Sequence, residues 1–138
     1  FRHPRFPAWF PGPGGATHPR AAWKGMERYI AHLKRQGIEL HWRVGLRHIN
    51  ERDNLATLWD YLRFGSLVML YGVGRSGIPH TVIPVDRVKA GGLIDDPGYP
   101  AEKNPRTWSN EDLLAWWTNY GRLYPARTLV ALFPLPVP

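Results

Sequence analysis

The residues best suited to chemistry lie between positions 77 and 100, in the stretch GIPHTVIPVDRVKAGGLIDDPGYP. His80 opens one apolar run, and Asp95 and Asp96 close the next. Two such runs, paired as adjacent antiparallel strands, would bring an imidazole and a carboxylate together. A carboxylate that accepts the Nδ1–H fixes the tautomer and leaves Nε2 free as a base. A lone histidine in this position is more often structural, and the following carboxylate is what favours a catalytic interpretation.

The segments around this stretch show strand and helix patterns. Strands are predicted at 66–73, 80–88, 91–95 and 128–135. Short glycine-containing connections between residues 67 and 95 favour antiparallel pairing. Ser109 and Asp112 form the start of a capping box, so a helix is predicted over 109–121.

The first part of the chain predicts two further helices and one strand. A helix should begin at Pro19 and stop at Gly37, because it carries an apolar stripe made of Trp23, Met26, Ile30 and Leu33. Alternation over 38–46 predicts a strand that buries Ile38, Leu40, Trp42 and Val44. Asp53 or Asn54 can cap a second helix, whose apolar face is Leu55, Leu58, Trp59 and Leu62 and which ends at Gly65.

The predicted order of elements indicates one α+β domain with a twisted antiparallel sheet and flanking helices. A chain of 138 residues supports a single core. We assign this domain to residues 19–134. Residues 1–18 are rich in Pro, Gly and aromatic side chains and predict an extended arm, and residues 135–138 form a short Pro-rich tail.

The charge of the chain is unevenly distributed. Residues 1–52 hold 10 Lys and Arg against 3 Glu, and residues 53–138 hold 8 basic against 8 acidic residues, which gives the net charge of +7. A basic surface attracts nucleic acid, anionic membranes or acidic proteins. The basic residues are scattered through helix and strand patterns, so we do not expect specific nucleic-acid binding. A protein partner bound through the aromatic arm and residues 1–52 is the preferred expectation, and an anionic membrane surface stays open.

Several other motifs do not lead to a function. Gly72–Gly77 matches G-x-G-x-x-G, but Ile78, Pro79 and another strand follow, where a dinucleotide site requires a helix. A glycine hairpin is the better interpretation.

The six histidines have no metal-binding spacing, and we expect neither a metal nor a cofactor. No apolar run approaches the roughly 20 residues that cross a bilayer, so the chain is not predicted to be transmembrane.

The succession LATLWDYLRFGSLVMLYGVGRSGIPHTVIPVDRVKAGGLIDDPGYP resembles the papain-like cysteine peptidases of the double-glycine, bacteriocin-processing kind and their secreted relatives. In that family a helix ending in Gly leads to a strand, a His opens the next strand, and an Asp-Pro closes the one after. The resemblance implies a papain-like half-barrel. It also implies that His80 is the general base and that Asp96, directly before Pro97, orients it. Asp95 matches the family pattern less well.

The chain departs from this family in one essential respect, because it contains no cysteine. The family carries its nucleophilic cysteine near the start of an N-terminal helix, usually after a Gln that supplies an oxyanion donor. Ser66 and Ser76 cannot replace it, since neither lies in a nucleophile elbow or at a helix N-terminus. His80 and Asp96 would then form a vestigial or partial dyad.

Two interpretations follow from the missing thiol. The preferred one is a catalytically incomplete, peptidase-like domain that binds a protein partner or serves as a subunit of a larger assembly. The alternative is the C-terminal part of an active peptidase whose cysteine-bearing helix lies upstream of Phe1. The start at Phe1 rather than Met suggests N-terminal processing, which fits an extracytoplasmic location.

Overall fold

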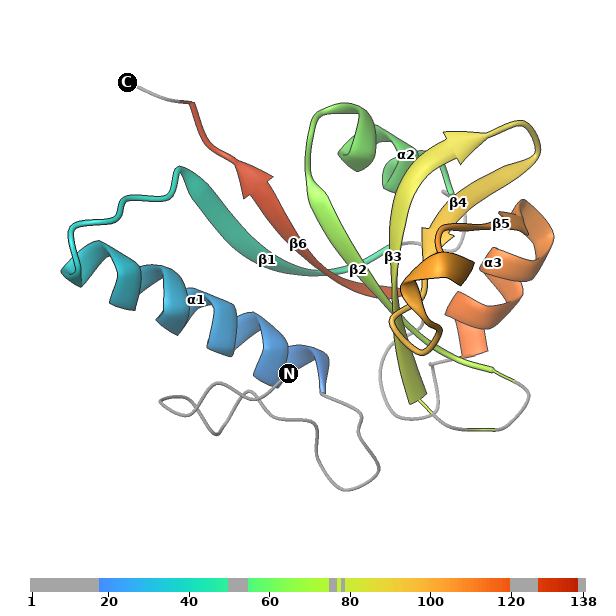
Figure 1. Cartoon of the computed structure of the whole chain (residues 1–138), viewed down its shortest axis with the longest axis horizontal. Coiled ribbons are helices and arrows are strands. Elements are labelled where there is room, and N and C mark those ends of the chain that lie inside the picture. The colour runs from blue at the N-terminus through green and yellow to red at the C-terminus, as the bar shows by residue number, and fades with distance from the viewer. Residues whose placement is uncertain (1–17, 50–54, 75–76, 78, 120–126, 137–138) are drawn as a thin grey trace.

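The computed structural model describes residues 18–49, 55–74, 77, 79–119 and 127–136. In this part of the chain, three α-helices and a 3-10 turn accompany a six-stranded sheet (Figure 1). The predicted caps at Asp53 and Asn54 and most of the predicted arm lie outside the described residues.

The sheet is open and antiparallel throughout, with the strand order β1-β6-β2-β3-β4-β5. Its strands are β1 (Trp42–His48), β2 (Leu67–Val73), β3 (Pro79–Val88), β4 (Gly91–Asp95), β5 (Arg106–Ser109) and β6 (Thr128–Pro134). The sheet is strongly twisted (Figure 1). These findings confirm the mixed α and β class and the antiparallel pairing.

The three helices cover the two faces of the sheet at different places. Helix α1 (Pro19–Arg35) packs on β1 and β6, whereas α2 (Ala56–Arg63) and α3 (Asn110–Thr118) pack on the strands from β2 to β5 (Figure 1). Neighbouring residues along a strand point to opposite faces. Tyr71 and Val130 therefore contact the α1 side, and Leu70 and Leu129 contact the α2 and α3 side.

The predicted helix ends are mostly confirmed. Gly37 and Gly65 follow α1 and α2 with positive φ angles of 81° and 86°, which glycine adopts at little cost. The side chain of Ser109 accepts a hydrogen bond from the Asp112 N–H and caps α3 as predicted. Within the described residues, no helix has both the length and the apolar composition that a bilayer crossing requires.

Three features differ from the sequence-based expectations. The first strand begins only at Trp42, and Ile38 and Leu40 are exposed, because their alternation continues into a segment that pairs with no strand. Strand β5 and the short 3-10 turn Ala101–Lys103 (η3) were not predicted. Both lie between β4 and α3, beside the predicted site, and β5 completes the sheet at that edge.

Candidate active site

His80 lies near the start of β3, directly opposite Gly72 of the neighbouring strand β2. Asp96 follows the last residue of β4. Alternation along the strands places His80 on the same face as the buried Val82, and Asp96 on the same face as the buried Ile94. Both of these apolar residues belong to the core beneath α2 and α3, so the imidazole and the carboxylate share one face of the sheet.

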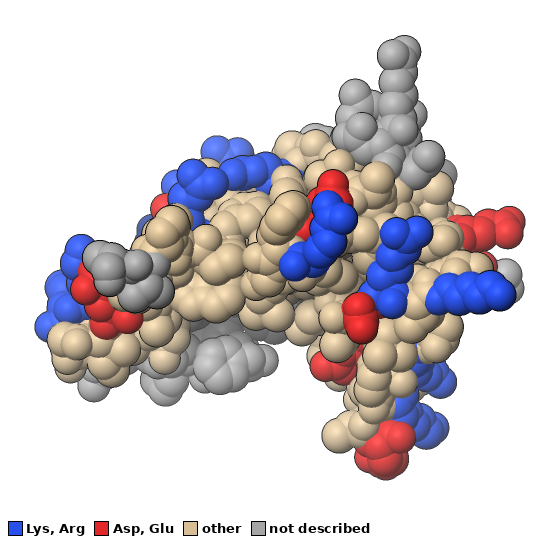
Figure 2. Space-filling model, turned by 90° about the horizontal axis from the view of Figure 1, so that it is seen from above, with Lys and Arg blue, Asp and Glu red and all other residues tan. Residues whose placement is uncertain are grey.

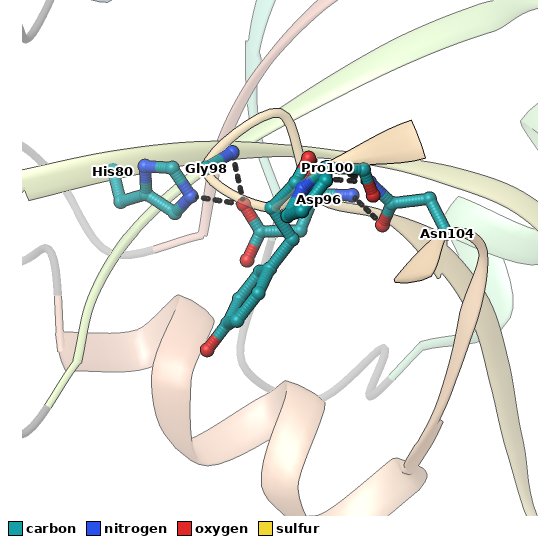
Figure 3. A network of polar contacts seen from close by, with 6 residues as sticks. His80, Asp96, Gly98, Pro100 and Asn104 are labelled. Carbon is teal, nitrogen blue, oxygen red and sulfur yellow. Dashed lines mark hydrogen bonds and ion pairs between the residues drawn. The ribbon is translucent and has the colours of Figure 1, made fainter. Parts of the chain in front are cut away.

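The structure brings His80 and Asp96 into direct contact. His80 Nε2 and Asp96 Oδ1 are 2.5 Å apart (Figure 3). The Asp96 side chain is only 8% exposed, whereas the His80 side chain is 38% exposed. A buried carboxylate therefore holds an imidazole that reaches the surface.

Asp96, and not Asp95, is the partner of His80. Asp95 is the last residue of β4 and pairs with Ile83, so its side chain points to the other face of the sheet. The ring nitrogens, however, have exchanged the expected roles. The sequence-based argument placed the carboxylate at Nδ1, but it binds Nε2, and no described residue forms a hydrogen bond with Nδ1. Nδ1 is therefore the nitrogen left to act as a base.

The turn after β4 fixes one oxygen of the carboxylate. Asp96 Oδ1 accepts a second hydrogen bond, of 2.8 Å, from the backbone N–H of Gly98. The Asp96 carbonyl accepts a bond from the Tyr99 N–H, which closes a turn over Asp96–Tyr99. Asp-Pro-Gly is a strong turn sequence because Asp bonds to the backbone two residues on and Pro presets its own φ. The carboxylate is thus held by its own loop as well as by the imidazole.

Asn104 contacts the backbone of Asp96 on both sides. Its Oδ1 accepts from the Asp96 N–H at 3.0 Å, and its Nδ2 donates to the Asp96 carbonyl at 2.9 Å (Figure 3). The same Nδ2 lies 3.2 Å from the Tyr99 carbonyl oxygen. One amide side chain therefore ties the two ends of the loop 96–104 together.

Gly98 lies against the imidazole–carboxylate pair. A Cβ at this position would be 3.1 Å from Asp96 Oδ1 and 3.3 Å from His80 Cε1. These distances are shorter than ordinary van der Waals contacts, so any larger side chain would press on both partners. Sequence reasoning did not identify Gly98 or Asn104; the Asp-Pro-Gly turn signal could have indicated Gly98, but nothing local to Asn104 indicates its long-range role.

The chemistry available to this arrangement is proton transfer. A neutral imidazole with Nε2–H bound to a carboxylate can accept a proton at Nδ1, and the carboxylate stabilises the cation that results. The chain has no cysteine to act as a thiol nucleophile beside this pair, and Ser66 is buried next to α2. Within the described ranges, no three His, Asp or Glu side chains are grouped so that they could hold a metal ion.

The basic residues do not form one continuous patch on the face shown in Figure 2, where Asp and Glu side chains lie between the Lys and Arg groups. Two arginines do converge elsewhere in the fold. The guanidinium groups of Arg43 and Arg47, both on β1, lie 5.8 Å and 5.2 Å from the centre of the Phe133 ring. This aromatic contact accounts for the position of two of the cations without a bound anion.

No protein-family model matches this chain, and no curated protein sequence matches it significantly.

Proposed function

We propose that this chain supplies the general base of a papain-like cysteine-peptidase site, with His80 as the base and Asp96 as the carboxylate that orients it. The observation that carries the proposal is the bond between His80 Nε2 and the buried Asp96 Oδ1, which leaves Nδ1 as the available nitrogen. The thiol would come from a segment outside these 138 residues, since none of them is cysteine. The antiparallel sheet would then be the wall of a papain-like half-barrel.

The way in which the pair is built favours a working base over a structural histidine. The carboxylate is nearly inaccessible. Its loop is held by three hydrogen bonds that involve the backbone of Asp96, two with the Asn104 side chain and one with the Tyr99 N–H. The imidazole keeps 38% of its surface exposed, so that a reacting group can approach it. Rigid support beneath an accessible nitrogen is what general-base catalysis requires.

In the proposed reaction, His80 Nδ1 takes the proton from the thiol, and the thiolate attacks the peptide carbonyl. The imidazolium then donates this proton to the departing amine as the C–N bond breaks. In the second half, Nδ1 takes a proton from water as the water oxygen attacks the thioester carbonyl. The C–S bond then breaks, the acid is released, and the imidazolium returns the proton to the thiolate. Asp96 remains ionised throughout and stabilises the imidazolium.

A second candidate function is a catalytically incomplete domain that binds a protein partner, and the missing cysteine favours it. The two candidates make opposite predictions for the natural polypeptide that contains this chain. If the site is active, that polypeptide will cleave double-glycine peptides and react with thiol-directed electrophiles. His80→Ala should then lower kcat about 10²–10⁴-fold, the range typical of a lost general base. A folded natural polypeptide that lacks both activities would leave the binding domain as the better assignment.

A further inference from the structure

Asp96 lies where the regular pairing of β4 ends. The last pair between β3 and β4 joins Ile83 to Asp95, and the pairing between β4 and β5 ends with Ile94 and Arg106. The backbone of Asp96 therefore has no partner strand. Both of its polar backbone groups are instead paired by the side chain of Asn104, which accepts from the N–H at 3.0 Å and donates to the carbonyl at 2.9 Å.

This double contact reproduces what a neighbouring strand would provide. In an antiparallel ladder, a hydrogen-bonded pair exchanges one N–H···O bond in each direction. A primary amide offers a donor and an acceptor side by side, and so it can complete the same ring with one residue. With its N–H and its carbonyl both fixed, Asp96 retains little freedom in φ or ψ, and the direction of its side chain is set accordingly.

We infer that Asn104 is a positioning residue of the proposed site: it extends the ladder by one residue and thereby aims the Asp96 carboxylate at His80 Nε2. The inference rests on the proposed function for its catalytic meaning. Asn104 forms no hydrogen bond with the imidazole, and it acts through the backbone of Asp96 and of the turn that follows it. The same Nδ2 also lies 3.2 Å from the Tyr99 carbonyl oxygen and 3.5 Å from the Pro100 carbonyl oxygen. These contacts secure the turn that delivers the Gly98 N–H to the same carboxylate oxygen.

A purely structural role would make a different prediction from a positioning role. If Asn104 only stabilises the loop, its loss lowers the melting temperature and leaves the bond between His80 and Asp96 in place. If it positions Asp96, its loss breaks or weakens that bond in a protein that is still folded. The proton on His80 Nε2 reports the difference, because a hydrogen-bonded imidazole N–H gives a downfield proton resonance that exchange with water removes once the bond is lost.

The experiment uses the 138-residue chain, labelled with ¹⁵N, and compares the wild type with Asn104→Ala. The expected result is loss of the His80 Nε2–H resonance, or at least a tenfold faster exchange of that proton, while the backbone amide spectrum of the sheet is retained. Asn119→Ala is the matched control, because this exposed asparagine at the end of α3 lies outside the loop 96–104. Its His80 resonance should be unchanged.

Retention of the His80 resonance at the wild-type exchange rate in folded Asn104→Ala would overturn the inference. If Asn104→Ala does not fold, Asn104→Gln provides the same test, because it keeps the amide but moves it by one methylene. The expected result is then faster exchange, and wild-type exchange would again contradict the positioning role. Neither outcome depends on thiol chemistry, so the inference and the proposed function can fail separately.

Discussion

The indole of Trp116 rests on the backbone of Gly72: a Cβ at position 72 would be 2.5 Å from Trp116 Cδ2. Gly72 is buried in β2 directly opposite His80, and so this contact joins α3 to the strand pair that carries the site. Gly72→Ala should destabilise the protein by about 1–3 kcal/mol, as expected for overpacking against a ring that cannot simply rotate away. Urea unfolding measures this change.

Gly74→Ala is the matched control for that substitution. A Cβ at position 74 would lie 3.9 Å from Trp116 Cδ1, which is an ordinary van der Waals contact. We expect a change of at most about 0.5 kcal/mol. Combining Gly72→Ala with Trp116→Leu should cost less than the sum of the two single changes, because each variant relieves the other. Additive effects would show that the contact does not limit the packing of α3.

Gly98→Ala should loosen the pair formed by His80 and Asp96. The new methyl group would lie 3.1 Å from Asp96 Oδ1 and 3.4 Å from His80 Nε2, so one partner must shift by a few tenths of an ångström. The global stability should change less than in Gly72→Ala, because Gly98 is exposed and its neighbours can move toward solvent. Exchange of the His80 Nε2–H with water is the measurement. An exchange rate equal to that of the wild type would show that the loop absorbs the methyl group without moving either side chain.

Trp117→Phe should cost about 2–4 kcal/mol. The Trp117 side chain is fully buried, and its Nε1–H donates to the Thr128 carbonyl at 2.8 Å. The change removes that hydrogen bond and leaves part of the indole volume empty. Trp108→Phe removes an indole that is only partly buried and should cost less. Thermal or urea unfolding of both variants tests this order, and a larger loss for Trp108→Phe would contradict it.

Stability should fall as the pH decreases below about 6.5, in part through His48. Burial lowers the pKa of His48, and its Nδ1 lies 2.9 Å from Thr128 Oγ1. Since the folded state disfavours the imidazolium, the unfolded chain binds the proton more readily in this range. The stabilisation from neutral His48 is therefore complete above the ordinary pKa of 6.5 and is lost on going to lower pH. His48→Gln should flatten the pH dependence of urea unfolding between about pH 5 and pH 7.5, and parallel curves for the variant and the wild type would contradict the assignment.

The 138-residue chain on its own should be inert toward thiol-directed electrophiles and double-glycine peptides. It has no cysteine, and loss of the nucleophile from a covalent mechanism typically removes several orders of magnitude in rate. His80→Ala should change neither result. Turnover by the purified chain that His80→Ala abolishes would mean that a nucleophile other than a thiol operates here.

The sequence was sufficient for most of the fold because the apolar periodicity is strong where tertiary packing is simple. Strands β2, β3, β4 and β6 were predicted to within one residue at each end. Strand β5 was missed because Arg106–Ser109 has four residues and no alternation of its own, and it becomes a strand only by pairing with β4. The opposite error occurred at Ile38 and Leu40, where alternation without a partner strand was taken for a strand.

The site was predictable in outline for a similar reason. Positions 80 and 96 fall at the ends of two strands joined by a short turn, and alternation then puts both side chains on one face. The choice of ring nitrogen was not predictable, because it depends on the rotamer of the imidazole, which strand alternation does not determine. The contact made by Asn104 could not be predicted from the sequence either, since it is formed with the backbone of a residue eight positions away.

The pairs of contacting residues in this fold differ in how far apart they lie along the chain. They therefore differ in the chain entropy that is lost when they are brought together. His80 and Asp96 are 16 residues apart, whereas His48 and Thr128, which join β1 to β6, are 80 residues apart. Because loop closure costs roughly 0.6 kcal/mol for each doubling of length, joining β1 to β6 costs roughly 1.4 kcal/mol more chain entropy than joining the pair at the site. The imidazole–carboxylate pair therefore belongs to the part of the sheet that closes locally, and the pairing of β1 with β6 adds the opposite edge of the open sheet at a greater entropic cost.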